Sequence, residues 1–350
     1  MARLAVYKYL ALLVLVLTVL VMVFTICGLL GGFFQPSNTA LAMLVYALPL
    51  LLLANVVLLA YWLIRRKWHW AVMPALSLLC SVHYVGTFYQ MELFGPNASN
   101  GSGLVVATYN VARFNNELSG FRAQDILAEM KRQQVDVFCI QEYKAKSGEH
   151  DNTSSYMEFF PYVAKGKDDM VIFSRFPILR TKTISFGETN NSAQWAEVNI
   201  RGKRIRVINV HLQTTGINRT LRQAAKADYQ GELVEHNRVL RMIYGNYTQG
   251  MVIRGQQADL IAAERDDSKQ PCIVCGDFND VPYSYVYRTV KGPLVDGFRE
   301  CGSGYMYTFR GNKQTRIDYI FHDERLKGQT YYKQNLTYSD HLPVFMKIQL

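Results

Sequence analysis

The stretch P-C-I-V-C-G-D-F-N-D, Pro271 to Asp280, places an apolar run directly before a group of polar side chains. The run Ile273–Cys275 predicts a buried strand that breaks at Gly276, and Asp277 and Asn279 follow at once. Carboxylates and amides at the end of a buried strand cost free energy unless they bind something. Residues two apart in an extended chain project to the same side, so Asp277 and Asn279 predict a shared binding site.

Further strands are predicted on both sides of this stretch, separated by a few helices. The predicted strands are Leu104–Val111, Val135–Gln141, Met170–Ser174, Gln194–Ile200, Arg204–His211, Cys272–Gly276, Arg316–Phe321 and Pro343–Leu350. Ala123–Gln133 and Gln256–Arg265 have the apolar spacing of helices. We therefore expect a four-layer α/β sandwich, in which two packed mixed β-sheets are flanked by helices.

The N-terminal part of the chain has a different composition. It contains three apolar stretches, Tyr9–Leu30, Ala40–Ile64 and Trp70–Tyr89, each close to the 20 or so residues that cross a bilayer as a helix. The first is too long for the apolar region of a signal peptide, and two more follow it. The sequence thus predicts a membrane anchor with three transmembrane helices over residues 1–94, a polar linker over 95–103 and a globular domain over 104–350.

The positions of the basic residues predict how this anchor is oriented. Arg3 and Lys8 precede the first span, and Arg65–Lys67 lies between the second and third spans. Basic residues next to membrane spans stay on the cytoplasmic side. We therefore expect a cytoplasmic N-terminus and an extracytoplasmic domain after Tyr89, on the periplasmic or extracellular side.

Charge and cysteine content narrow the classes of partner. Five of the 38 basic residues and one of the 28 acidic residues precede residue 96, so the remainder carries a net charge of about +6. This suits an anionic substrate or an anionic membrane surface but is weak for a nucleic-acid interface. Cys272 and Cys275 favour packing within a strand over a metal or redox site, although an extracytoplasmic location permits a disulfide that involves Cys301.

Polar residues gather at the ends of several predicted strands, which can meet at one edge of a sheet. They are Asn110, Glu142, His211, Asp277, Asn279, Asp318, Asp340 and His341. Carboxylates and amide oxygens suit Mg²⁺ or Mn²⁺. Cleavage of a phosphate ester needs such an ion, an activated water and donors to the phosphoryl oxygens, and this set supplies each.

The ordered motifs T-Y-N-V, Q-E, V-H-L, G-D-F-N-D, R-I-D-Y-I and S-D-H resemble those of the endonuclease/exonuclease/phosphatase superfamily. This superfamily includes pancreatic deoxyribonuclease, abasic-site endonucleases, neutral sphingomyelinases and inositol polyphosphate 5-phosphatases. The resemblance covers about residues 104–350, and it implies that this domain is a metal-dependent phosphodiesterase or phosphatase.

Several metal and substrate contacts follow from the resemblance. Glu142 is expected to be the principal Mg²⁺ ligand, with Asn110 beside it on the metal or the phosphate. Asp340 is expected to be an outer ligand or a ligand to a second metal.

The resemblance also implies catalytic roles. Asp277 is expected to orient or deprotonate the attacking water, and Asn279 to bind the phosphate. His341 would contact the scissile phosphate while Asp318 fixes its tautomer, and His211 would stabilise the transition state or protonate the leaving group.

The polar, basic segment from Gln213 to Gly255 has no counterpart in these motifs, and two interpretations stay open. It is either a solvated helical insertion or a basic lid or membrane-facing arm over the site.

Three functions remain compatible with the sequence. The first is a membrane-anchored phosphoesterase that acts on lipids or lipid head groups, favoured by the tether and the mild basicity. The second is an extracytoplasmic nuclease for DNA or RNA, which would want a stronger basic stripe with stacking aromatics. The third is a non-catalytic scaffold or receptor domain, which the full set of polar residues disfavours.

Overall fold

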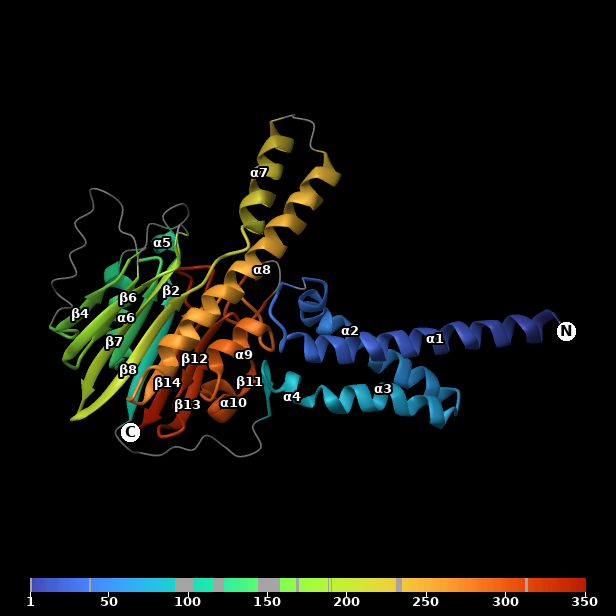
Figure 1. Ribbon diagram of the computed structural model, residues 1–350, viewed down its shortest axis with the longest axis horizontal. Coiled ribbons are helices and arrows are strands. Elements are labelled where there is room, and N and C mark those ends of the chain that lie inside the picture. The colour runs from blue at the N-terminus through green and yellow to red at the C-terminus, as the bar shows by residue number, and fades with distance from the viewer. Residues whose placement is uncertain are drawn as a thin grey trace. The chain divides into compact units, whose positions relative to one another are not determined.

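The computed structural model describes residues 2–37, 39–91, 103–115, 123–143, 158–167, 170–187, 189, 191–230, 235–311 and 314–350 (Figure 1). The chain divides into two compact units. One consists of Met1–Thr87 with Pro282–Arg288, and the other of Phe88–Val281 with Thr289–Leu350. The expected linker, residues 95–103, lies outside the described residues except for Gly103.

The helical unit contains α1 (Ala2–Gly31), α2 (Thr39–Ile64), α3 (Trp68–Cys80) and α4 (Val82–Val85). Two of its segments, Val6–Gly31 and Thr39–Ile64, are long and apolar enough to cross a membrane, and only a minority of their residues are buried. Polar side chains bridge the two helices: Asn55 Nδ2 donates to Thr25 Oγ1 at 2.8 Å, and Trp62 Nε1 donates to Thr18 Oγ1 at 2.9 Å.

The structure corrects the expectation of three long membrane helices. The expected third span, Trp70–Tyr89, divides into the 13-residue helix α3 and the four-residue helix α4. A helix of 13 residues reaches only about 20 Å, less than the hydrocarbon core of a bilayer. The end of the expected span lies outside any helix, because Tyr89–Gln90 forms β1 and pairs with β11 (Gly304–Tyr305). Within the described residues, two helices therefore meet the length criterion.

The second part of the helical unit is Pro282–Arg288, a segment that begins two residues after Asp280. The guanidinium of Arg288 lies 3.9 Å from the ring centroids of both Phe33 and Tyr283. A Cβ atom on Gly32 would lie 1.9 Å from the carbonyl oxygen of Tyr283, so only glycine fits there. The loop between α1 and α2 thus packs closely on this segment.

The larger unit contains two six-stranded sheets. The first has the order β10 (Val295–Asp296), β12 (Asp318–His322), β9 (Cys272–Asp277), β8 (Lys203–His211), β7 (Ser192–Ile200) and β6 (Ile178–Ser185). The second has the order β13 (Lys327–Lys333), β14 (Val344–Gln349), β2 (Leu104–Asn110), β3 (Val137–Gln141), β5 (Val171–Ser174) and β4 (Tyr162–Lys165). Both sheets are mixed, because β8–β9 and β2–β3 are parallel and the other pairs are antiparallel.

A helix covers the outer face of each sheet. Helix α6 (Ala123–Arg132) buries Ile126 and Met130 in one cluster with Tyr109 and Phe138. Helix α8 (His236–Asp266) lies on the other sheet, where Trp195 Nε1 donates to Glu264 Oε2 at 3.0 Å. The apolar core between the sheets combines side chains of both. The structure therefore confirms the predicted α/β sandwich of mixed sheets and helices.

Short helices and one long hairpin complete this unit. The short helices are α5 (Ala112–Asn115), α9 (Tyr285–Lys291), which begins in the helical unit, and α10 (Gly297–Cys301). The hairpin consists of α7 (Ile217–Tyr229) and the first half of α8. The predicted helix Gln256–Arg265 is the last part of the 31-residue helix α8.

Candidate active site

The sheet topology brings the polar strand ends to one edge. In the first sheet His211 pairs with Asp277, and Asp277 pairs with Asp318. In the second sheet Asn110 pairs with Gln141, directly before Glu142. The parallel strands end at this edge, and the antiparallel strands β12 and β14 begin there. Side chains from distant parts of the sequence therefore meet.

Asn110 joins the two sheets at this edge. Its Nδ2 donates to Asp277 Oδ2 at 3.0 Å and to Glu142 Oε1 at 3.2 Å. Its Oδ1 accepts from the backbone N–H of Ala112 at 3.0 Å, which fixes the orientation of the amide. The nitrogen of Asn110 thus faces both carboxylates. This orientation supports a role in holding the two carboxylates more than the expected role as a metal ligand.

Backbone conformations with positive φ concentrate at this edge. Glu142 has φ 56°, Asn279 has φ 51°, and Ala112 and Arg113 have φ 45° and 52°. Non-glycine residues adopt this region at a cost of roughly 1 kcal/mol or more, and such residues cluster at functional sites. At Gly276 (φ 137°) a Cβ atom would lie 2.0 Å from Val210 O, so β9 requires glycine just before Asp277.

The buried carboxylate of Asp277 is held by its own loop. Oδ1 accepts from the backbone N–H of Asn279 at 2.8 Å, and Oδ2 accepts from Asn279 Nδ2 at 3.2 Å. Asn279 Nδ2 also donates to Leu212 O at 2.9 Å. Asp277 and Asn279 therefore share one site, as the opening motif predicts. The amide hydrogens of Asn279 face the protein, so contact with a phosphate requires one of these bonds to exchange.

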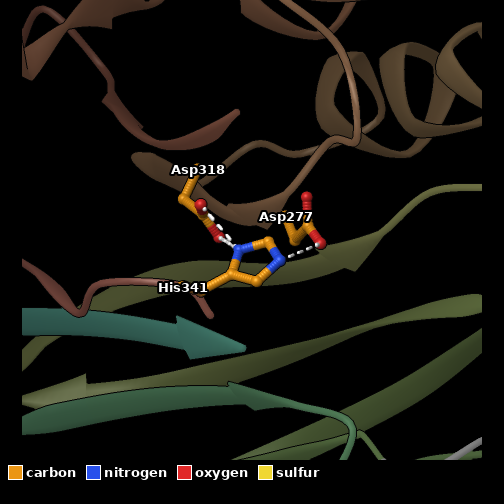
Figure 2. A group of neighbouring side chains, drawn as sticks. All are labelled: Asp277, Asp318 and His341. Atoms are coloured by element: carbon orange, nitrogen blue, oxygen red, sulfur yellow. Dashed lines mark hydrogen bonds and ion pairs between the residues drawn. The ribbon is translucent and has the colours of Figure 1, made fainter. Parts of the chain in front are cut away.

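Asp318 and His341 form a buried carboxylate–imidazole pair (Figure 2). His341 Nδ1 lies 3.0 Å from Asp318 Oδ2, while Nε2 lies 3.7 Å from Asp277 Oδ2. Burial by itself would lower the pKa of His341, but the charges of Asp318 and Asp277 outweigh it and raise that pKa to about 10. Burial raises the pKa of Asp318 to about 6. At neutral pH the pair is an imidazolium and a carboxylate.

His211 faces the two carboxylates from β8. Its Nε2 lies 3.8 Å from Glu142 Oε1 and 3.8 Å from Asp277 Oδ2. Its Nδ1 is buried and has no hydrogen-bond partner among the residues that the structure describes. The imidazole can therefore turn a proton on Nε2 toward a group bound between the carboxylates.

Asp340 differs from the other expected site residues. Its side chain is exposed, and its Oδ1 accepts a long hydrogen bond from Ser339 Oγ at 3.4 Å. The group whose ligand atoms lie within 4.8 Å of one another contains Asp277, Asp318 and His341, without Asp340. The structure brings together seven of the eight expected side chains and leaves Asp340 at the rim.

Several residues that support the site by hydrogen bonds were not predicted from the sequence. Ser339 Oγ donates to Asn110 O at 2.8 Å and accepts from the N–H of His341 at 3.1 Å. Gln141 Nε2 donates to Asn209 Oδ1 at 2.6 Å and thereby links the two sheets. Gln141 and Asn209 could have been noticed as polar residues within predicted buried strands, because such positions are normally apolar.

Arg254 of α8 was expected only as one of the basic residues of the insertion. It is fully buried, and its Nε donates to Asp280 Oδ2 at 3.1 Å. Its Nη1 donates to Gln213 O at 3.1 Å. Arg254 therefore fastens the insertion to the loop that carries Asp277 and Asn279.

The donor set fits a hard divalent cation. Glu142 and Asp277 bring two carboxylates to one amide and one imidazole, which leaves an excess of negative charge. Oxygen ligands of this kind suit Mg²⁺ or Mn²⁺. Asp318 is less suited as a ligand, because both of its oxygens face His341 Nδ1.

The cysteines supply no ligand to this group. All six thiols are free, and Cys139, Cys272 and Cys275 are buried. Burial raises the pKa of Cys272 to about 12, which keeps it a neutral thiol. Cys275 packs in the core between the sheets, as expected.

Comparison with protein families places this site in a known context. A model of the endonuclease/exonuclease/phosphatase family matches residues 107–341, which include all of the expected site residues. A second model, described as a domain of unknown function, matches residues 11–88. A comparison with curated proteins found no match.

Solved structures share the fold at low sequence identity. An endonuclease/exonuclease/phosphatase from Beutenbergia cavernae has a TM-score of 0.52 and 18% identity, over 71% of this chain and 72% of its own. A protein of the same description from Bacteroides vulgatus has a TM-score of 0.51 and 18% identity, over 71% and 100%. D. rerio TDP2, solved with a single-strand DNA product, has a TM-score of 0.50 and 16% identity, over 71% and 100%.

Proposed function

Because the chain belongs to the endonuclease/exonuclease/phosphatase family, whose members are phosphoric ester hydrolases, we propose that it is a membrane-anchored, Mg²⁺-dependent phosphoesterase that acts on a lipid or lipid-head-group phosphate. One observation carries the proposal. Asn110 joins Glu142 and Asp277 across the two sheets, while His211 and His341 both direct Nε2 toward Asp277. Two carboxylates and two imidazoles around one point supply the acids and bases of hydrolysis.

Asp277 orients the attacking water and takes its proton. Its carboxylate is fixed by Asn110 and Asn279, so it meets the water without reorganisation. Asn279 keeps Asp277 in place and, by exchanging one hydrogen bond, contacts the phosphate.

His341 binds the phosphoryl group. Its raised pKa makes it a cation at neutral pH, and Asp318 holds Nδ1 so that Nε2 faces the site. A fixed positive charge aimed at the phosphoryl oxygens stabilises the charge that develops in the transition state. His211, at the end of β8 next to Asp277, donates a proton to the leaving oxygen.

Glu142 is the proposed main ligand of Mg²⁺, since its carboxylate is the partly exposed one of the two that meet at Asn110. When bound, the ion neutralises phosphate charge and activates water. Asn110 orients the ligand, and Asp340 at the rim is the proposed outer ligand.

The lipid substrate is proposed from the helical unit and the charge of the larger unit. Only a minority of the apolar residues of α1 and α2 are buried, as in helices that face lipid. A net charge of about +6 after residue 95 suits the binding of anionic head groups.

The test uses the full chain purified in detergent. Sphingomyelin, phosphoinositides, nucleotides and plasmid DNA are offered with Mg²⁺ or with EDTA. Asp277→Asn should abolish turnover, and Asp267→Asn, at a side chain that is 84% exposed, should leave it unchanged. Lipid turnover that needs Mg²⁺ and Asp277 supports the proposal. Plasmid nicking without lipid turnover would favour a nuclease instead. Absence of turnover with every substrate would favour a non-catalytic scaffold.

The side of the membrane is a separate proposal. We propose that α3 and α4 together form a short third crossing, which puts the larger unit outside the cytoplasm. Ser81 between them keeps a helical backbone, and its N–H donates to Ser77 O at 3.2 Å. Alkaline phosphatase fused after Tyr89 should then be active. An inactive fusion would show two crossings and a cytoplasmic enzyme.

A further inference from the structure

The hairpin of α7 and α8 starts and ends at the active-site edge. Residues Gln213–Gly216 lead from the end of β8 into α7. The N–H of Gln213 donates to Gln257 Oε1 of α8 at 2.8 Å, which holds this connection against α8. Arg254 of α8 binds both Gln213 O and Asp280. The base of the hairpin is therefore fastened to the loop that follows Asp277.

The two halves of α8 differ in burial. The second half buries Met251, Arg254, Ala258 and Ile261. The first half and α7 stand away from the sheets (Figure 1). We call the described residues of this projecting segment, 217–230 and 235–250, the arm. It bonds to itself, since Asn246 Nδ2 of α8 donates to Thr220 Oγ1 of α7 at 3.1 Å.

The arm exposes large apolar and aromatic side chains. Tyr229 is 92% exposed, Leu240 63% and Tyr244 55%, and Met242 and Leu221 are exposed as well. Leu240 and Tyr244 are four residues apart and so lie on the same face of α8. These exposed apolar side chains do not add to the stability of the folded chain. An exposed apolar surface of this kind indicates a binding site for a partner.

Cations accompany these side chains. Lys226, Arg238 and Arg241 are exposed, and within the described residues none of them forms an ion pair. Arg241 is three residues from both Arg238 and Tyr244, so the cations alternate with the apolar side chains around α8. Exposed cations beside exposed leucine and tyrosine allow one helix to contact lipid phosphates and the head-group region together.

We propose that the arm docks on an anionic lipid surface, with Tyr229, Leu240 and Tyr244 in the head-group region and the cations on lipid phosphates. Exposed leucine and methionine favour lipid over nucleic acid, because bases stack on aromatic rings and gain little from aliphatic chains. The chain also carries two helices apolar enough to cross a bilayer. The catalytic consequence rests on the proposed function: docking would bring lipid phosphates to the edge where the arm begins.

The first experiment measures docking without catalysis. The full chain, with Cys80→Ser to remove an exposed thiol, is labelled with acrylodan at Tyr229→Cys and placed in nanodiscs. The discs contain phosphatidylcholine alone or mixed with phosphatidylserine. A matched control carries the label at Lys203→Cys, the exposed first residue of β8. Emission at residue 229 should shift to the blue with phosphatidylserine, and emission at residue 203 should not. Equal emission at both positions in both discs would overturn the proposal.

The second experiment uses a charge-reversed arm, Lys226→Glu/Arg238→Glu/Arg241→Glu. The shift at residue 229 should disappear, because each cation near an anionic surface contributes about fivefold to binding. Turnover of a lipid phosphate in vesicles should fall at least about tenfold, whereas hydrolysis of bis(p-nitrophenyl) phosphate in solution should be unchanged. Loss of DNA binding with no lipid-dependent shift would overturn the proposal in favour of a nucleic acid. A shift without any hydrolysis would refute the proposed function alone.

Discussion

The two ends of β12 each carry a histidine–carboxylate pair, and only one of them belongs to the active site. At the first end, Asp318 lies 3.0 Å from His341 Nδ1. At the last end, Glu300 lies 2.7 Å from His322 Nε2. The second nitrogen of His322 is already occupied, since Nδ1 lies 2.9 Å from Asp323 O. The second nitrogen of His341 lies 3.7 Å from Asp277 Oδ2, which is longer than a hydrogen bond.

A buried imidazole–carboxylate pair is therefore not by itself a sign of catalysis. His322 uses both ring nitrogens within the fold, so it has no hydrogen-bonding capacity left for a ligand. His341 keeps one nitrogen directed at the edge where the two sheets end. Arg316 and Asp296, close by, form a third buried pair that is closed, with two bonds of 2.6 and 2.8 Å.

The largest effect should separate the two histidines. His341→Ala should lower kcat/KM by about 10²–10⁴-fold, because it removes the cation that faces the phosphoryl group. His322→Ala should leave hydrolysis per folded molecule unchanged. Initial rates with the substrate found in the lipid panel measure both. Equal losses of kcat/KM in the two variants would show that the two histidines do not differ in function.

The closed pair should matter for stability instead. Asp296→Ala leaves Arg316 buried without its carboxylate and should lower the free energy of unfolding by about 3–5 kcal/mol. Thermal unfolding of the full chain in detergent measures the loss. Asp296→Ala/Arg316→Met, which removes the stranded charge, should recover much of it. A double variant no more stable than the single one would contradict this account.

A smaller effect is expected at the carboxylate of the open pair. Asp318→Asn should reduce kcat by about 10–100-fold, the usual effect of losing the partner that orients an active-site group. The variant Asp318→Asn/His341→Ala should be no slower than His341→Ala, because the two residues act as a unit. Multiplicative losses in the double variant would instead mean independent roles.

The smallest effect concerns Glu300. Its burial by itself raises its pKa, but the hydrogen bond and charge of His322 outweigh it and lower the pKa overall. A lowered carboxylate pKa contributes stability above the unfolded value near 4.5, and this contribution is lost as the pH falls through the folded pKa. Glu300→Gln should therefore cost about 0.5–1 kcal/mol at pH 7, and this cost should disappear as the pH falls through the folded pKa of Glu300. Unfolding measured across this pH range tests it, and a cost that persists in acid would contradict it.

Much of the fold was predictable because its central strands alternate or run apolar. Strand β9 and the hairpin of β7 and β8 lie close to their predicted positions. The strands of the two large sheets that were missed, β4, β6, β10 and β13, all lie at sheet edges, and β6 is mostly polar and exposed. Edge strands have one unpaired side in water, so their sequences lack the apolar pattern.

The site was predictable as a set of residues but not as an arrangement. The order of motifs gave Asn110, Asp277 and His341, because polar residues at strand ends are conspicuous. Nothing local to Asn110 indicates which atom of its amide faces the carboxylates. That orientation depends on the backbone turn at Ala112. The burial of Arg254 depends equally on Asp280, 26 residues away along the chain.

The passage of Pro282–Arg288 through the helical unit has a practical consequence for expression. A fragment that begins at residue 104 would retain both sheets and every site residue. It would lack Phe33, one of the two rings that enclose Arg288, and Tyr84, whose ring centroid lies 5.5 Å from that of Tyr283. Tyr283 stands four residues after Asn279, so the truncation would loosen the chain just beyond the Asp277 loop. Assays with the full chain keep the packing of Pro282–Arg288 intact.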